Sequence, residues 1–500
     1  MNQRRIGAVL TYVHAFAHIV ISLLYVPLLL ATIGRSEYGL FQLIGSVMSY
    51  LAVAEALLSS GVLRYYCKYR DLGDTVMMEN TLAVSRRIYR LFSALVAVAG
   101  VLLTFGVDLV YSSSLTAAEL QEAKYMLLVL TAGIIFNLLS YVYTAFITAN
   151  EKFSFSKSLV LLSTLLQPIL VLALIRLYPH ALLIVSIQAG LSLATALAKW
   201  AYAKKKLGVR IIYHGRDLAL VKRLLVFSAG VFLAALADQI FWKADQLILG
   251  KLYGSAAVAV YAIGAQIYGN YRPAGTSIAS VFLPRVSALY NVEHNMNAIS
   301  ALFAKTGRLV FLLAALILSG FALFGKEFIR LWAGEGYEEA YWVAMVVMVP
   351  LTVDMIQYLG LTILQVLNRY AFRGKMYFII AALNIVSTVF FARWWGLTGA
   401  AISTAASMVI GSGILMNLYY SRVGIDVRGF WRAIVSLLPG ALIAAVPGLL
   451  IRQLVLPNAW FSFALHVVLF TAVYSVIMYL TAMNPYERGL IRSVVCKLRR

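Results

Sequence analysis

Charged side chains interrupt two apolar runs near the middle of the chain, and each run is long enough to cross a membrane. Asp238, Lys243 and Asp245 interrupt the first of these runs, and Arg272 interrupts the second beside Asn270. A charge at bilayer depth is costly, so it marks either a transport pathway or a buried pair of charges. Asp245 lies near the end of its run, which favours a structural role.

The first apolar run of the chain carries a stripe of polar residues. Thr11, His14, His18, Ser22 and Tyr25 recur at spacings of three or four residues, which places them on one face of a helix. Because lipid would not tolerate such a stripe, we expect it to face a polar interior.

Glu55 lies in the second apolar run, at the depth of His14 if the two runs are antiparallel neighbours. We therefore expect a carboxylate and an imidazole within reach of each other. The pair is either a buried structural hydrogen bond or a site for a proton or a substrate.

Asp238 and Arg272 lie near the midpoints of the seventh and eighth apolar runs, and therefore at a similar depth. One interpretation is an ion pair that locks neighbouring helices. The other is that Arg272 and Lys243 bind a diphosphate, because a guanidinium matches phosphate oxygens bidentately. Pro273 removes a backbone donor and predicts a kink beside Arg272.

Asp354 is a further charge at mid-membrane depth, and Gln357 and Tyr358 share its helix face. This cluster either binds a proton or sodium and couples transport to an ion gradient, or it is a buried carboxyl satisfied by its neighbours. The sequence has no Walker A loop and no zinc-type spacing of Cys and His. We therefore expect no cofactor and no metal, and energy from a proton, sodium or substrate gradient.

The composition predicts an all-α polytopic membrane protein, because 62% of the residues are hydrophobic and only 12% are charged. About fourteen apolar runs approach the roughly 20 residues that a bilayer requires. Lys and Arg concentrate in every second connection, which places both termini in the cytoplasm and explains the net charge of +22 without a nucleic-acid partner. Cys67 and Cys496 fall in segments predicted to be cytoplasmic, so we expect no disulfide.

Weak internal similarity favours two pseudo-symmetric halves. Gly34 matches Gly254 at an offset of 220, and Asn150 matches Asn368 at an offset of 218. Such repeats are typical of transporters with a central cavity. The predicted parts are a six-span N-terminal lobe (1–202), a cytoplasmic linker (203–224), a six-span C-terminal lobe (225–420), a further helix pair (421–483) and a basic amphipathic tail (484–500). We expect the tail to lie on anionic lipid rather than to bind a protein partner.

Two segments resemble a known family. The segment DQLILG at 245–250, followed by Gly254 and AVY at 259–261, is similar to the seventh-to-eighth-span signature of polysaccharide-repeat flippases of the O-antigen and capsule type. The segment GRSEYGLF at 34–41 is similar to their first-to-second-span turn. The resemblance covers nearly the whole chain and extends to the multidrug, oligosaccharidyl-lipid and polysaccharide exporter superfamily. It implies a V-shaped cavity between two lobes and alternating access.

The expected function is therefore transport and not an enzymatic reaction. We expect a lipid-linked oligosaccharide on a polyprenyl diphosphate to cross the cytoplasmic membrane, with membrane lipids and polysaccharide assembly proteins as partners. The predicted cavity is lined by His14, His18, Glu55, Asp238, Lys243, Gln266, Asn270 and Arg272.

Two alternatives remain open at this point. A multidrug or cation antiporter of the same superfamily would favour a cavity dominated by carboxylates. A membrane glycosyltransferase or polysaccharide polymerase would need catalytic groups on a sizeable loop or domain outside the bilayer, and this sequence shows neither.

Overall fold

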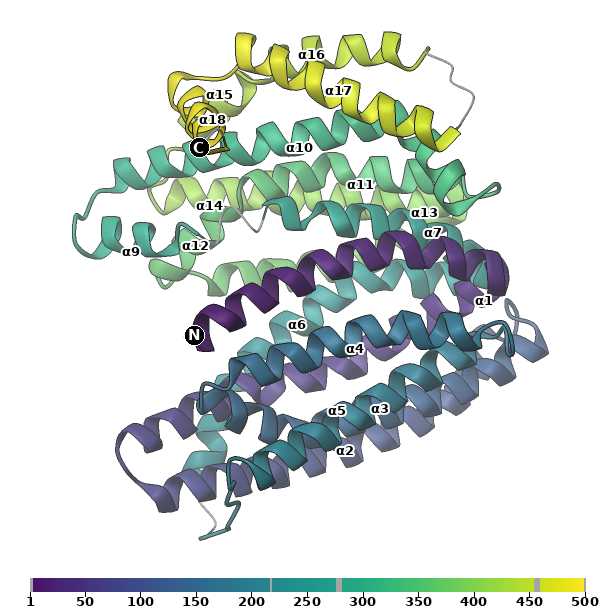
Figure 1. Cartoon of the computed structure of the whole chain (residues 1–500), viewed down its shortest axis with the longest axis vertical. Helices are drawn as coiled ribbons and strands as arrows, with labels where there is room; N and C mark the ends of the chain where they lie inside the picture. The colour runs from purple at the N-terminus through teal and green to yellow at the C-terminus, as the bar shows by residue number, and fades with distance from the viewer. Residues whose placement is uncertain (1–2, 216–217, 276–280, 454–458, 499–500) are drawn as a thin grey trace. The chain divides into compact units, whose positions relative to one another are not determined.

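The structure is a computed structural model that describes residues 3–215, 218–275, 281–453 and 459–498 (Figure 1). The regular elements within these ranges are all helices, which confirms the predicted all-α membrane fold. Ten helices within them are long and apolar enough to cross a membrane. Two of the ten are 51 residues long, and each contains a kink, at Gly34 in the first and at Trp395 and Gly396 in the second. The total of about fourteen spans stays a prediction.

The chain forms two compact units, Met1–Ala259 and Val260–Arg500, which are called unit 1 and unit 2 below. The elements of unit 1 are α1 (Gln3–Asp71), α2 (Thr75–Tyr111), α3 (Ala117–Ala149), α4 (Phe153–Leu174), α5 (Ala181–Lys205), α6 (Leu218–Tyr253) and the start of α7 (Ser255–Tyr271). Helix α6 packs along α1. By its contacts α6 therefore belongs to unit 1, and the predicted division into an N-terminal lobe (1–202) and a C-terminal lobe (225–420) stays a prediction.

Unit 2 contains the rest of α7 and a further series of helices, one of which is a π-helix. Its further elements are α9 (Leu283–Asn291), α10 (Met296–Ala333), α11 (Glu339–Ile356), α12 (Tyr358–Val366), α13 (Ala371–Met408), the π-helix η1 (Val409–Leu415), α14 (Met416–Arg422), α15 (Val427–Val435), α16 (Leu438–Ile451), α17 (Ala459–Thr481) and α18 (Pro485–Leu498). Helix α7 ends at Tyr271, directly before Arg272 and two residues before Pro273, which confirms the predicted kink.

The backbone supports the internal repeat. Gly34 and Gly254 each join two helices with nearly equal positive φ angles, 78° and 77°, at the predicted offset of 220. Glu151 and Asn368 likewise follow a helix end with φ angles of 55° and 53°. In both turns the hydrogen bonds close in the same pattern. Asn368 therefore corresponds to Glu151, so the offset here is 217 and the predicted match with Asn150 is one residue out of register.

A close backbone contact joins the first of these turns to the start of α7. Gly39 in α1 approaches Ser255 so closely that a Cβ atom at Gly39 would lie 1.8 Å from the Ser255 carbonyl oxygen. The hydroxyls of Ser36 and Ser255 are 2.8 Å apart, and both donate to Glu119 of α3. Glycine at position 39 is therefore required by the packing at this end of unit 1.

The predicted linker at 203–224 packs against α2 along its described part. His214 Nε2 lies 2.7 Å from Glu79 Oε2, and the His214 backbone N–H donates to Asn80 Oδ1. The guanidinium of Arg87 lies 3.4 Å from the ring centroid of Tyr213. The linker is thus attached to α2 by hydrogen bonds from His214 and by a cation–π contact.

The basic tail is helical, as predicted, and its first turn is anchored within unit 2. Glu487 is almost fully buried and accepts hydrogen bonds from Nε and Nη2 of Arg308 in α10, at 2.6 and 3.0 Å. The side chain of Cys496 lies outside the described residues. Contact of the tail with anionic lipid stays a prediction.

We predict that Gly39→Ala lowers the midpoint of thermal unfolding of the purified protein in detergent. The added methyl group clashes with backbone atoms of α7, and overpacking of this kind typically costs about 1–3 kcal/mol. Gly106→Ala is the matched control, because Gly106 lies within α2 with open space around its Cα, so that alanine should be neutral or slightly stabilising. Equal midpoints for the two variants would contradict the close contact.

Candidate functional site

Unit 1 contains a partly polar cavity of about 350 Å³ between α1, α3 and α5. This volume lies in the range of small-molecule pockets. The polar side chains that line it are Ser49 and Glu55 from α1, Asn137 from α3, and Gln188 and Ser192 from α5. The cavity therefore offers both hydrogen-bond donors and acceptors within a bundle of membrane-spanning helices.

Glu55 is held by two neighbours on one face of α3. Asn137 Nδ2 and Tyr141 Oη each donate a hydrogen bond to its carboxylate, both at 3.2 Å. Asn137 and Tyr141 are four residues apart, so they lie one above the other on the same side of the helix. The positive charge of Lys199 in α5 acts on the same carboxylate. The charge of Glu55 is thus partnered by protein groups at the wall of the cavity.

The predicted pairing of His14 with Glu55 is wrong. His14 Nε2 lies 3.0 Å from Thr164 Oγ1 of α4, while the carboxylate of Glu55 is bonded to α3. The depth of a residue along a span fixes its height in the bundle, but it does not fix the direction in which the side chain points. Helix α4 packs against α1 and receives His14 instead.

A basic cluster lies on α1 and α4. The rings of His14 and His18 have centroids 6.3 Å apart, and the charge of Lys157 in α4 acts on His14. Sequence reasoning did not select Lys157 because it lies close to the start of its span. The spacing of Lys157 and Thr164, which are seven residues apart and share a helix face, was the available signal.

The polar residues of α6 divide into a buried pair and a half-buried pair. Asp245 and Gln246 are buried, and Gln246 accepts a hydrogen bond from the hydroxyl of Ser46 in α1. Asp238 and Lys243 are half-buried. Burial of Asp245 against α1 agrees with the structural role that its position in the sequence favours.

The remaining predicted cavity residues lie in unit 2. Gln266 and Asn270 are half-buried on α7, and Arg272 is half-buried in the turn that follows. A contact between Arg272 and Asp238, which belongs to unit 1, stays a prediction.

Unit 2 contains a polar site of its own, which surrounds Asp354 at a break between two helices. Helix α11 ends at Ile356 and α12 begins at Tyr358, so Gln357 lies in the break with its side chain buried. Asp354 Oδ1 accepts a 2.6 Å hydrogen bond from Ser412 Oγ in the π-helix η1. Helix breaks and π-helical turns within membrane spans are often found at functional sites.

Arg373 contributes a positive charge to the same site. Together with Asp354 and Gln357 it lines a cavity of about 10 Å³, which has room for about one water molecule. The charges of Asp354 and Arg373 act on each other, and Gln357 Oε1 is buried without a hydrogen-bond partner in the protein. Asp354 and Gln357 therefore line one cavity, together with the cation Arg373, while binding of a proton or sodium there stays a prediction.

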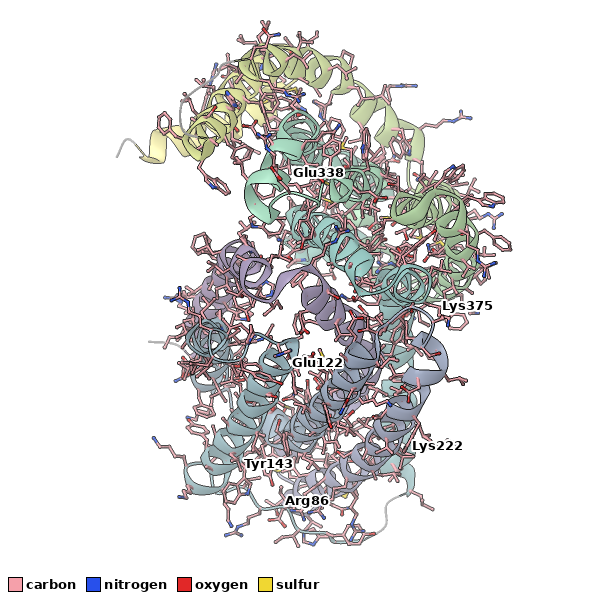
Figure 2. All side chains as sticks on the ribbon, turned by 90° about the vertical axis from the view of Figure 1, so that its right-hand side faces the viewer. Arg86, Glu122, Tyr143, Lys222, Glu338 and Lys375 are labelled. Atoms are coloured by element: carbon pink, nitrogen blue, oxygen red, sulfur yellow. The ribbon has the colours of Figure 1, made fainter. Side chains whose placement is uncertain are left out.

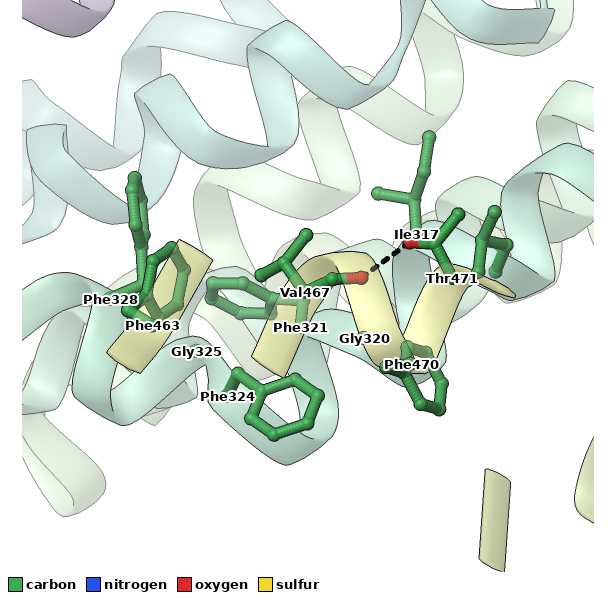
Figure 3. A pocket seen from close by; sticks show the side chains of 11 residues that line it. Ile317, Gly320, Phe321, Phe324, Gly325, Phe328, Phe463, Val467, Phe470 and Thr471 are labelled. Carbon is green, nitrogen blue, oxygen red and sulfur yellow. Dashed lines mark hydrogen bonds between the residues drawn. The ribbon is translucent and has the colours of Figure 1, made fainter. Parts of the chain in front are cut away.

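An apolar groove of about 300 Å³ lies between α10 and α17 in unit 2 (Figure 3). Five phenylalanines dominate its lining, namely Phe321, Phe324, Phe328, Phe463 and Phe470. The hydroxyl of Thr471 donates to the Val467 carbonyl oxygen at 2.7 Å, so it does not need a partner in the groove. Sequence reasoning missed the groove because an apolar residue that faces a groove has the same pattern as one that faces lipid.

Comparison with known proteins gives both sequence and structural relatives. A family described as polysaccharide biosynthesis protein matches residues 7–290. The uncharacterized membrane protein EpsK of Bacillus subtilis (strain 168) is 23% identical over 480 residues, which are 93% of this chain and 92% of the relative.

Two kinds of solved structure share the fold. The lipid II flippase MurJ in an inward closed conformation aligns with a TM-score of 0.75 and 16% identity, over 97% of this chain and 99% of that chain. An inward-facing multidrug resistance transporter of the MATE family, from the MOP superfamily, aligns with a TM-score of 0.61 and 14% identity, over 84% and 99% of the two chains. These findings confirm the resemblance noted in the sequence. Because the matched region covers more than half of its residues, this chain belongs to the polysaccharide biosynthesis protein family.

Proposed function

We propose that this chain moves a lipid-linked oligosaccharide, carried on a polyprenyl diphosphate, from the cytoplasmic to the outer leaflet by alternating access. The observation that carries the proposal is the polar cavity at Glu55, enclosed by helices of membrane-spanning length. A substrate with sugar, diphosphate and hydrocarbon parts needs surfaces of three different chemistries. The described residues provide one surface suited to each part.

The cavity suits the sugar. Sugar hydroxyls both donate and accept hydrogen bonds, and the carboxylate of Glu55 with the amides of Asn137 and Gln188 offers both functions. Phe41, which lines the same cavity, provides an apolar surface for the face of a sugar ring. A chamber of this kind can accept different sugars through rearranged hydrogen bonds.

The basic cluster of His14, His18 and Lys157 suits the diphosphate. A diphosphate carries several negative charges, and basic side chains bind phosphate oxygens through charge-assisted hydrogen bonds. The ammonium group of Lys157 attracts such an anion by its charge, and a neutral imidazole can donate a ring N–H to a phosphate oxygen. Diphosphate binding by Lys243 and by Arg272, which the sequence suggested, stays a prediction.

The apolar groove between α10 and α17 suits part of the polyprenyl tail. Within a bilayer the tail gains nothing from the hydrophobic effect, since lipid is already apolar. The attraction must instead come from close van der Waals packing, which the aromatic rings of Phe321, Phe324 and Phe470 can supply.

We propose that a proton gradient drives transport through Asp354. A sodium ion at this carboxylate would lie close to Arg373, and the repulsion between two neighbouring cations is large where the dielectric is low. The cavity beside Asp354 has room for about one water molecule. One water molecule can relay a proton, whereas the cavity is too small for a hydrated sodium ion. The broken helix at Gln357 provides the irregular backbone that transporters use at coupling sites.

A cation antiporter is the second candidate, and Glu55 is the observation that favours it. A carboxylate in a membrane cavity attracts a cationic substrate. Lys199 opposes this function, because its charge already acts on Glu55. A transport assay with a lipid-linked oligosaccharide and with a cationic dye can therefore distinguish a flippase from a cation antiporter.

Glu55 allows a test of substrate choice. We expect the purified chain in proteoliposomes to speed the exchange of a fluorescent polyprenyl-diphosphate oligosaccharide between leaflets, and not to transport a cationic dye. Glu55→Gln should slow the exchange about tenfold, because a hydrogen bond to a charged group contributes about 1.5–3 kcal/mol. Glu293→Gln is the control, since Glu293 pairs with Arg285 at an exposed site. Dye transport without oligosaccharide exchange would identify an antiporter instead.

Asp354 allows a test of coupling to the proton gradient. Asp354→Asn should retain downhill exchange and lose its acceleration by an imposed proton gradient, because an amide cannot take up the proton. The readout is the exchange rate with and without a pH step across the vesicle membrane. Acceleration that persists in Asp354→Asn, or that depends on sodium, would contradict proton coupling at this carboxyl.

A further inference from the structure

Three side chains that could bind a metal ion converge at the end of unit 1 where the Gly34 turn lies. Glu37 comes from α1, Glu122 from α3, and His180 immediately precedes α5 (Glu122 is labelled in Figure 2). One ligand atom of each residue lies within 4.8 Å of the other two. Neither the cavity at Glu55 nor the basic cluster includes any of these residues.

Backbone hydrogen bonds fix the orientation of both carboxylates. Glu37 Oε2 accepts the N–H of Ala181 at 2.7 Å, and Glu122 Oε1 accepts the N–H of Leu182 at 3.0 Å. These bonds cap the start of α5 and account for one oxygen of each carboxylate. The second oxygens, Glu37 Oε1 and Glu122 Oε2, both point toward the ring of His180. Glu37 and Glu122 also form a side-chain hydrogen bond with each other, so the two carboxyl groups and the imidazole meet at one point.

The distances match ligands around a shared cation better than direct hydrogen bonds. His180 Nδ1 lies 3.5 Å from Glu37 Oε1 and 3.5 Å from Glu122 Oε2. Direct N–H···O bonds are usually about 2.7–3.2 Å long. The pair of His214 and Glu79 at 2.7 Å is an example in this chain. Ligand atoms about 2.0–2.1 Å from a tetrahedral zinc ion are about 3.3 Å apart, close to the spacing observed at His180.

Charge and burial favour a bound cation as well. The side chains of Glu37 and Glu122 are only 22% and 14% exposed, so solvent screens their mutual repulsion poorly. A positive ion between Glu37 Oε1 and Glu122 Oε2 removes this repulsion. The side chain of His180 is 44% exposed, which leaves a path by which an ion and a water ligand can enter.

We propose that Glu37, Glu122 and His180 bind a zinc ion that ties together the ends of α1, α3 and α5. One imidazole nitrogen and two carboxylate oxygens are ligands that zinc accepts, and a water molecule completes a tetrahedral site. The hydrogen bonds from Ala181 and Leu182 hold the carboxylates in place, as outer-shell partners do at known metal sites. The site stabilises unit 1 and does not depend on what the chain transports.

The experiment uses the full chain, purified without a histidine tag, stripped with a chelator and titrated with zinc chloride. Competition with a fluorescent zinc chelator gives the affinity, and elemental analysis after desalting gives the stoichiometry. We expect one zinc per chain, an affinity at least about tenfold weaker in His180→Ala and in Glu122→Gln, and a higher unfolding temperature with zinc in the unaltered chain alone. His214→Ala is the matched control, because it removes another His–Glu contact and should bind zinc like the unaltered chain.

Two results would overturn the proposal. The first is an unaltered chain that retains no zinc after desalting. The second is equal zinc affinity in the unaltered chain and in His180→Ala or Glu122→Gln, which would show binding elsewhere. Size-exclusion profiles identify any variant that fails to fold, and Glu37→Gln then replaces it in the comparison.

Discussion

A polar side chain inside a membrane must find its partners within the protein, because lipid offers none. Glu55 meets this constraint through Asn137 and Tyr141, and Asp354 meets it through Ser412. Each of these contacts joins residues that are far apart in the sequence, so the same bonds that satisfy a carboxylate also set the packing of the helices. At Glu55 the packing leaves a cavity beside the satisfied carboxylate. Structural stability and a polar chamber thus come from one arrangement.

Features that depend on local chemistry were predictable from the sequence. Apolar runs of spanning length predicted the all-α membrane fold. Pro273 predicted the helix break beside Arg272, because proline removes a backbone donor wherever the helix packs. Gly34 and Gly254 indicated equivalent turns, since a positive φ angle is comfortable mainly for glycine. The family resemblance was also carried by these turn segments, which the comparison with known proteins confirms.

Features that depend on the rotation of a helix, or on contacts between elements that are far apart in the sequence, were not predictable. The proposed pair of His14 and Glu55 rested on depth alone, and the rotation of α1 carries His14 to Thr164 instead. The break at Gln357 has no proline or glycine beside it to signal it. The cluster of Glu37, Glu122 and His180 is assembled from three elements that are far apart in the sequence, so no spacing in the sequence reveals it.

The central claim is that the cavity at Glu55 admits water and receives the sugar of the substrate. The most direct test places a cysteine at Ser192, which lines the cavity, in a chain whose Cys67 and Cys496 are serine, and measures labelling by a membrane-impermeant thiol reagent. A cysteine at the neighbouring exposed Leu193 is the control for lipid-facing positions. The account predicts that Ser192→Cys is labelled and that lipid-linked oligosaccharide protects it, with neither effect at Leu193→Cys. Absence of labelling at Ser192→Cys, or labelling that the substrate leaves unchanged, would contradict it.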